Sequence, residues 1–116
     1  MSAIHLVDDS ATMLMSMEML LKRAGYTVTK SESAEAAMTA LESISPKLII
    51  TDLNMPGMNG IELIKTLKQQ SKFRFTPMLM LTTESQQSRR EEAKAAGATG
   101  WLVKPVAASV CNLCDT

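Results

Sequence analysis

Residues 48–60 have the sequence LIITDLNMPGMNG, in which a short apolar run is followed by an aspartate and then by proline and glycine. An apolar run of this length predicts a buried strand that ends at Asp52. Proline and glycine predict a loop over residues 54–60, and helical spacing follows from about residue 61 to residue 70. The segment therefore predicts a strand, a loop and a helix, with an acidic side chain at the carboxyl end of the strand.

Strand and helix patterns alternate on both sides of this segment. Before it, we expect strands at residues 3–7 and 26–30 and helices from residue 10 or 11 to residue 24 and at residues 34–44. After it, we expect strands at residues 77–82 and 99–103, with a helix at residues 86–96 between them. Apolar strands that alternate with helices indicate a parallel sheet covered on both faces. The predicted fold is therefore α/β, a doubly wound five-stranded parallel sheet of the flavodoxin-like kind, with a short or incomplete fifth helix in residues 106–116.

The composition indicates a single domain over residues 1–116. Lysine and arginine together number 12, as do aspartate and glutamate, so no overall charge attracts nucleic acid or an anionic membrane. No apolar run approaches the roughly 18 to 20 residues that span a bilayer. The chain begins without a basic segment and meets two acids before residue 10, unlike a signal peptide. We therefore expect a cytoplasmic protein that binds neither nucleic acid nor a membrane directly.

Five chemically active residues fall at the carboxyl ends of the expected strands: Asp8, Asp9, Asp52, Thr82 and Lys104. In doubly wound sheets, ligands bind outside these strand ends, where the strand order reverses. Carboxylates that meet there repel one another unless a cation relieves them, and a site of oxygen ligands suits Mg²⁺ better than zinc or copper. A carboxylate beside a metal is also the kind of nucleophile that forms an aspartyl-phosphate, and a lysine and a hydroxyl could hold the phosphate oxygens.

Each of these features has an ordinary structural explanation when it is taken alone. An acidic pair after a strand is often a helix N-cap, which would account for Asp8 and Asp9. Asp52 could be a loop acid, Thr82 a plain strand end and Lys104 part of a solvated turn. What favours a functional site is that these residues follow separate strands and gather at one edge.

Four motifs occur in a fixed order along the chain. They are the acidic pair at residues 8 and 9, the segment 48–60, the run LMLTTE at residues 79–84 and the run GATGWLVKP at residues 97–105. With these motifs, the chain resembles the CheY-like receiver domains of response regulators in two-component signalling, from residue 4 to about residue 106.

The resemblance implies a phosphorylation site and a metal site. Asp52 is the implied phosphoryl acceptor, and the implied donor is a sensor histidine kinase or a phosphotransfer protein. Mg²⁺ is expected to bind Asp9 and Asp52, with help from Asp8 and the backbone carbonyl of Asn54. Such a domain catalyses its own phosphorylation and dephosphorylation but is otherwise a switch and not an enzyme.

The resemblance also implies how the switch works. Lys104 is expected to pair with the phosphate, and Thr82 is expected to turn its hydroxyl toward it. Trp101 takes the place of the aromatic residue whose inward movement accompanies activation. A downstream target protein would then read the altered surface, as in chemotaxis or a phosphorelay carried out by a stand-alone regulator.

Two other classes of protein share parts of this pattern. Phosphatases of the haloacid dehalogenase type also use an aspartyl nucleophile, but they place a second acid two residues later, where this chain has Asn54. A flavodoxin-like electron carrier would share the fold. It would need a phosphate-binding loop after the first strand and aromatic residues for the flavin, and this sequence offers one Trp and one Tyr.

Several features depart from the family pattern or fall outside it. Thr83 stands where a small residue is usual, so we expect slower phosphorylation by small donors than in a Thr83→Ala variant.

The first helix is apolar nearly all round, with methionines that either fill gaps in the core or form a contact surface. We hypothesise a homodimer through helix one and the helix-five region.

The Cys111 and Cys114 pair is interpreted as two helix-face cysteines, and His5 as a packed histidine.

Overall fold

The computed structural model describes residues 3–53, 55, 57–82 and 90–103, and for residues 82, 90 and 101–103 it describes the backbone alone. The strands are β1 (Ala3–Val7), β2 (Thr27–Ser31), β3 (Leu48–Asp52), β4 (Met78–Thr82) and β5 (Gly100–Val103). The helices are α1 (Ala11–Arg23), α2 (Ala34–Leu41), α3 (Gly60–Lys68) and α4 (Arg90–Ala96), and a short 3₁₀ turn, η1, spans Ser71–Phe73.

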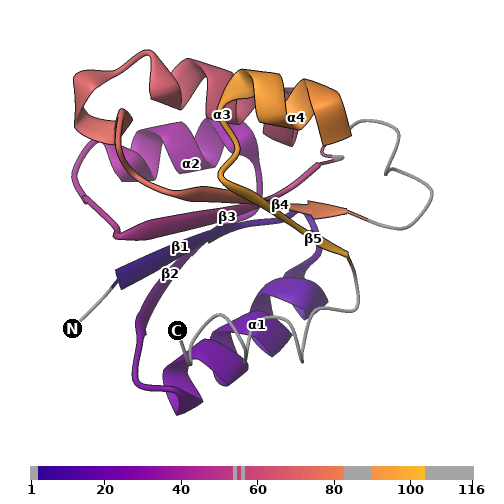
Figure 1. Ribbon diagram of the computed structural model, residues 1–116. Helices are drawn as coiled ribbons and strands as arrows, with labels where there is room; N and C mark the ends of the chain where they lie inside the picture. Colours follow the sequence, from indigo (N-terminus) through magenta and orange to yellow (C-terminus); the bar gives the residue numbers. More distant parts are fainter. Residues whose placement is uncertain (1–2, 54, 56, 83–89, 104–116) are drawn as a thin grey trace.

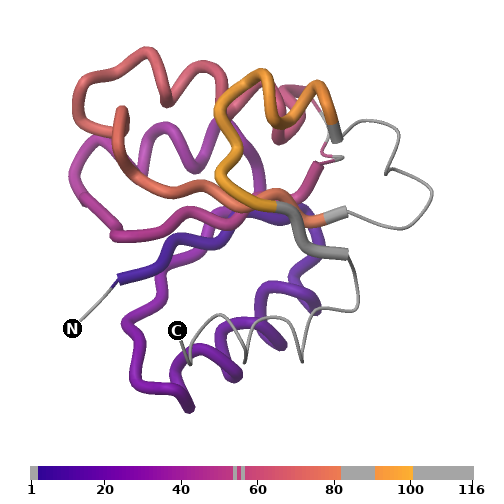
Figure 2. Tube along the Cα trace, in the orientation of Figure 1, coloured from indigo at the N-terminus to yellow at the C-terminus, as the bar shows by residue number. Residues whose placement is uncertain are grey.

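All five strands run parallel in the order β2-β1-β3-β4-β5 (Figure 1). Helix α1 lies on one face of the sheet, and α2, α3 and α4 lie on the other, as the trace in Figure 2 also shows. This arrangement confirms the predicted doubly wound sheet. The expected fifth helix lies outside the described residues.

The core has two halves because successive strand residues point to opposite faces of the sheet. On β3, Ile50 belongs to the cluster under α1, whereas Ile49 belongs to the cluster under α2 and α3. On β4, Leu79 and Met80 divide in the same way. Burial on both faces explains why these strands appear in the sequence as continuous apolar runs.

The methionines of α1 serve two environments. Met17 is buried beside Leu14 and Leu21 in the core half that faces the sheet. Met15 and Met19 are 60% and 57% exposed. Met17 therefore fills part of the core, whereas the contact surface stays a prediction for the exposed Met15 and Met19.

Capping residues account for several helix boundaries. Ser10 accepts a hydrogen bond from the backbone N–H of Met13, and Asn59 forms a reciprocal capping box with Glu62. Helix α2 ends at Leu41, three residues before the predicted end at residue 44. Among the described helices, none is long and apolar enough to cross a membrane.

The strand order reverses between β1 and β3, which are hydrogen-bonded neighbours at the centre of the sheet. Val7 pairs with Thr51, so the residues that follow β1 emerge beside the last residue of β3. In doubly wound sheets this is where a ligand binds.

Candidate functional site

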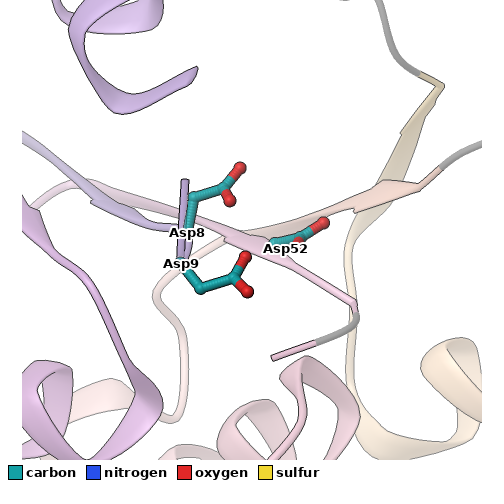
Figure 3. Close-up of side chains that lie close together, drawn as sticks. All are labelled: Asp8, Asp9 and Asp52. Carbon is teal, nitrogen blue, oxygen red and sulfur yellow. The ribbon is translucent and has the colours of Figure 1, made fainter. Parts of the chain in front are cut away.

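Three carboxylates meet at the carboxyl ends of β1 and β3 (Figure 3). One oxygen from each of Asp8, Asp9 and Asp52 can be chosen so that all three lie within 4.8 Å of one another. Asp8 and Asp52 are 1% and 6% exposed, whereas Asp9 is exposed to solvent. The cluster therefore consists of two carboxylates set into the sheet edge and a third at the surface.

Backbone and side-chain hydrogen bonds fix Asp8. Its backbone N–H donates to the carbonyl of Ser31 over 3.2 Å, which extends the pairing of β1 with β2 by one residue. Its Oδ1 accepts a hydrogen bond of 3.0 Å from the backbone N–H of Ser10. Because Ser10 is the N-cap of α1, the acidic pair stands just before the helix and not at its cap. The ordinary explanation of Asp8 and Asp9 as N-cap residues is therefore wrong.

Close packing of α3 against β3 fixes the position of Asp52. The backbone N–H of Leu53 donates a hydrogen bond to the carbonyl of Leu81. The N–H of Gly60 donates to the carbonyl of Leu53 over 2.9 Å. A Cβ atom at Gly60 would collide with the carbonyl oxygen of Asp52 and would lie 2.9 Å from the sulfur of Met80. Glycine at position 60 thus lets the helix approach the end of the strand, which the sequence alone did not indicate.

The electrostatics of the cluster favour a bound cation. Two ionised carboxylates whose oxygens lie 4.8 Å apart, the upper limit within this cluster, repel each other by roughly 3 kcal/mol at an effective dielectric constant of about 20. A divalent cation among three such groups replaces repulsion by attraction. The donors are carboxylate oxygens, which Mg²⁺ prefers and which suit soft metals poorly. The residues present therefore fit a magnesium site.

The remaining predicted site residues stand at the same edge or outside the described part of the chain. Thr82 ends β4 and pairs with Val103, which ends β5. Trp101 lies within β5, where its backbone pairs with Met80. The other residues singled out in the sequence lie outside the described residues: Asn54, Thr83, Lys104, Cys111 and Cys114.

A further acidic residue contacts the loop between Asp52 and α3. Glu35, in the first turn of α2, accepts a hydrogen bond of 3.3 Å from the backbone N–H of Met58. The sequence does not single out Glu35, because an acid in the first turn of a helix is common and Met58 lies 23 positions further along the chain.

Comparison with known proteins identifies the family of the chain. The family model described as the response regulator receiver domain matches residues 4–112. The chemotaxis protein CheY of Pseudomonas aeruginosa is 36% identical over 108 residues, which cover 92% of this chain and 87% of that protein.

Solved structures extend the likeness to three dimensions. The chemotaxis response regulator CheY4 of Vibrio cholerae has a TM-score of 0.92 at 38% identity, with 99% of this chain and 97% of that chain covered. The receiver domain of the sensor histidine kinase PA1611 from Pseudomonas aeruginosa has a TM-score of 0.88 at 26% identity, with 98% and 94% covered, and holds a magnesium ion in its active site cleft. The match of the family model over nearly the whole chain, together with a relative that is 36% identical, shows that the chain belongs to the response regulator receiver domain family.

Proposed function

We propose that Asp52 accepts a phosphoryl group from a histidine kinase or a phosphotransfer protein, with Mg²⁺ held beside it, and that phosphorylation switches a protein-binding surface. The observation that carries this proposal is the meeting of three carboxylates from β1 and β3 where the strand order reverses. The magnesium ion in the cleft of the PA1611 receiver domain supports it.

The metal site would use residues from both strands. Asp9 and Asp52 would hold Mg²⁺, with Asp8 and the backbone carbonyl of Asn54 as further contributors. When bound, the ion supplies positive charge that offsets the repulsion among the carboxylates and the charge on the phosphoryl oxygens.

Asp52 performs the covalent step. Its carboxylate oxygen forms a bond to phosphorus while the N–P bond of the donor phosphohistidine breaks, and the electron pair of that bond returns to the imidazole nitrogen. Because Asp52 is 6% exposed, its carboxylate is reached from the strand-end edge, which restricts how a donor approaches. Its place at the end of a central strand keeps the acceptor oxygen fixed.

The switch depends on residues at the ends of β4 and β5. The acyl phosphate carries about two negative charges and three strong acceptor oxygens. We expect the Lys104 ammonium to pair with these oxygens and the Thr82 hydroxyl to donate to them. Movement of Thr82 would let Trp101 pack inward, and a target protein would bind the resulting surface.

Two-component signalling is the setting of this domain family, and the named CheY relatives point to chemotaxis. We propose that the chain acts as a stand-alone regulator in chemotaxis or a phosphorelay, without direct binding to nucleic acid. We propose the cytoplasm as the compartment of the chain, because a chemotaxis relative such as CheY acts there. The chain would catalyse its own phosphorylation and dephosphorylation and no reaction of another substrate.

The decisive experiment compares wild type with Asp52→Asn, which keeps the side-chain shape and removes the nucleophilic carboxylate. Both proteins are incubated with acetyl phosphate, with and without MgCl₂, and the acyl phosphate is measured by intact mass and by its release with hydroxylamine. We expect labelling of wild type that requires Mg²⁺ and is absent from Asp52→Asn.

Equal labelling of the two proteins would refute the assignment of Asp52, and labelling that is independent of Mg²⁺ would refute the metal site. Beryllofluoride titration read by the fluorescence of Trp101, the single tryptophan of the chain, provides an independent measurement of the same site.

A further inference from the structure

The loop that follows Asp52 contacts α2 through the side chain of Glu35. The backbone N–H of Met58 donates to Glu35 Oε2 over 3.3 Å. Gly57, the residue before it, has a φ of +78°, and a Cβ atom there would lie 2.9 Å from the same carboxylate oxygen. The absence of a side chain at position 57 thus leaves room for the carboxylate to reach the loop.

The other described hydrogen bonds of this loop join it to its own strand, to β4 and to α3. Leu53 and Gly60 connect its two ends, and Asn59 with Glu62 caps α3. The Glu35 contact joins the loop to α2, an element that contributes no carboxylate to the cluster. It therefore restrains the loop at Met58, which the described hydrogen bonds to β3, β4 and α3 do not reach.

We infer that Glu35 is a positioning residue that raises the affinity of the site for Mg²⁺ by holding this loop in place. The inference rests on the proposed metal site, in which the loop contributes a backbone carbonyl two residues after Asp52. A loop already held in its binding conformation loses less conformational freedom when the ion binds, so its affinity is higher. Glu35 acts through the loop backbone and is not itself a ligand.

Three variants separate the effect of the contact between Glu35 and Met58 on Mg²⁺ affinity from the effect of losing a negative charge. Glu35→Ala removes the contact and the charge, whereas Glu35→Gln removes the charge and keeps an oxygen that can accept from Met58. Glu32→Ala is the matched control, because Glu32 is also exposed and directly follows β2 at the same edge of the sheet. Urea unfolding of each variant without metal verifies that the fold is intact.

The measurement is a titration of ¹⁵N-labelled protein with MgCl₂, followed by the amide resonances of Asp9, Leu53 and Met58. We expect Glu35→Ala to bind Mg²⁺ roughly three- to ten-fold more weakly, the change that corresponds to the loss of one hydrogen bond. Glu35→Gln should stay closer to wild type than Glu35→Ala does, and Glu32→Ala should match wild type within about two-fold when salt screens long-range charge.

Gly57→Ala supplies a second, independent test. The added methyl group would meet the Glu35 carboxylate, and the φ of +78° at position 57 strains any side chain in both backgrounds. The substitution should therefore weaken Mg²⁺ binding more in the wild-type background than in the Glu35→Ala background, and an equal loss in both would count against the contact.

The outcomes distinguish the two proposals. If wild type shows no saturable Mg²⁺ binding, the proposed metal site fails. If wild type binds Mg²⁺ and Glu35→Ala binds it equally well, or Glu32→Ala is weakened as much as Glu35→Ala, the positioning role of Glu35 is refuted while the metal site stands.

Discussion

Acidification from about pH 7 to about pH 5 should destabilise this protein through the buried imidazole of His5. His5 lies in β1 and is 0% exposed. Its Nδ1 shares a hydrogen bond of 2.6 Å with the hydroxyl of Thr29, and its Nε2 shares one of 2.8 Å with the hydroxyl of Ser31. Both partners lie on β2, which pairs with β1 in register. Because hydroxyls donate and accept, they satisfy the neutral ring in either tautomer but offer no negative charge to an imidazolium.

The size of this destabilisation follows from the difference between the pKa values of His5 in the folded and unfolded chain. Burial lowers the pKa of His5 from 6.5 to about 4. The unfolded chain therefore binds a proton at higher pH than the folded chain does, so stability is fully present above pH 6.5 and is lost as the pH falls toward 4. Linkage gives a loss of roughly 2 kcal/mol between about pH 7 and about pH 5, and about 3 kcal/mol once both states are protonated.

The assay is urea unfolding of wild type and His5→Gln at about pH 7, 6 and 5. Carboxylates titrate in both proteins, so their contribution cancels in the comparison. Wild type should lose roughly 2 kcal/mol more than the variant over this range. The chain has one histidine, so the ring resonances in an NMR titration of wild type belong to His5 alone. An imidazole that titrates near 6.5 in the folded protein, or parallel pH profiles for the two proteins, would refute the reasoning.

The remaining predictions concern phosphorylation and assembly. Thr83→Ala should be phosphorylated several-fold faster than wild type by acetyl phosphate, because a smaller side chain widens access to Asp52; equal rates in a time course would contradict this. If a homodimer forms through α1 and the helix-five region, replacing the exposed Met15 and Met19 by lysine should shift the protein toward monomer in light scattering at equal concentration. A wild-type protein that stays monomeric across the concentration series would rule the dimer out.

Much of the fold could be predicted because short continuous apolar runs are typical of buried strands, whereas apolar residues at helical spacing are typical of helices. The clearest limit is the end of α2. Residue 44 continues the helical spacing of Ala37 and Leu41, which led to a helix predicted through residue 44. Ile44 does pack against the same core cluster, but it does so from the connection after the helix. Pro46 follows closely, and helices usually end before a proline. The spacing of apolar residues shows that a residue faces the core. It does not show whether that residue lies in the helix or in the connection after it.

The three carboxylates could be predicted because each directly follows or ends a strand, and parallel strands bring such residues to one edge. The contact between Glu35 and Met58 could not, since it depends on the path of a loop and on the positive φ of Gly57. The requirement for glycine at position 60 has the same origin, because the close approach of α3 to β3 is a property of the packed structure.

The strand order suggests which side of the molecule responds to phosphorylation. Asp52 ends β3, which has hydrogen-bonded neighbours on both sides, whereas β5 comes last in the order, beyond β4. Moving β3 or β4 would disturb two ladders, because each has a paired strand on both sides, whereas moving the end of β5 disturbs only its ladder with β4. Thr82 and Trp101 belong to these two strands. If Asp52 is phosphorylated, we therefore expect the added charge to be relieved by movement on the β5 side, where a target protein would detect it.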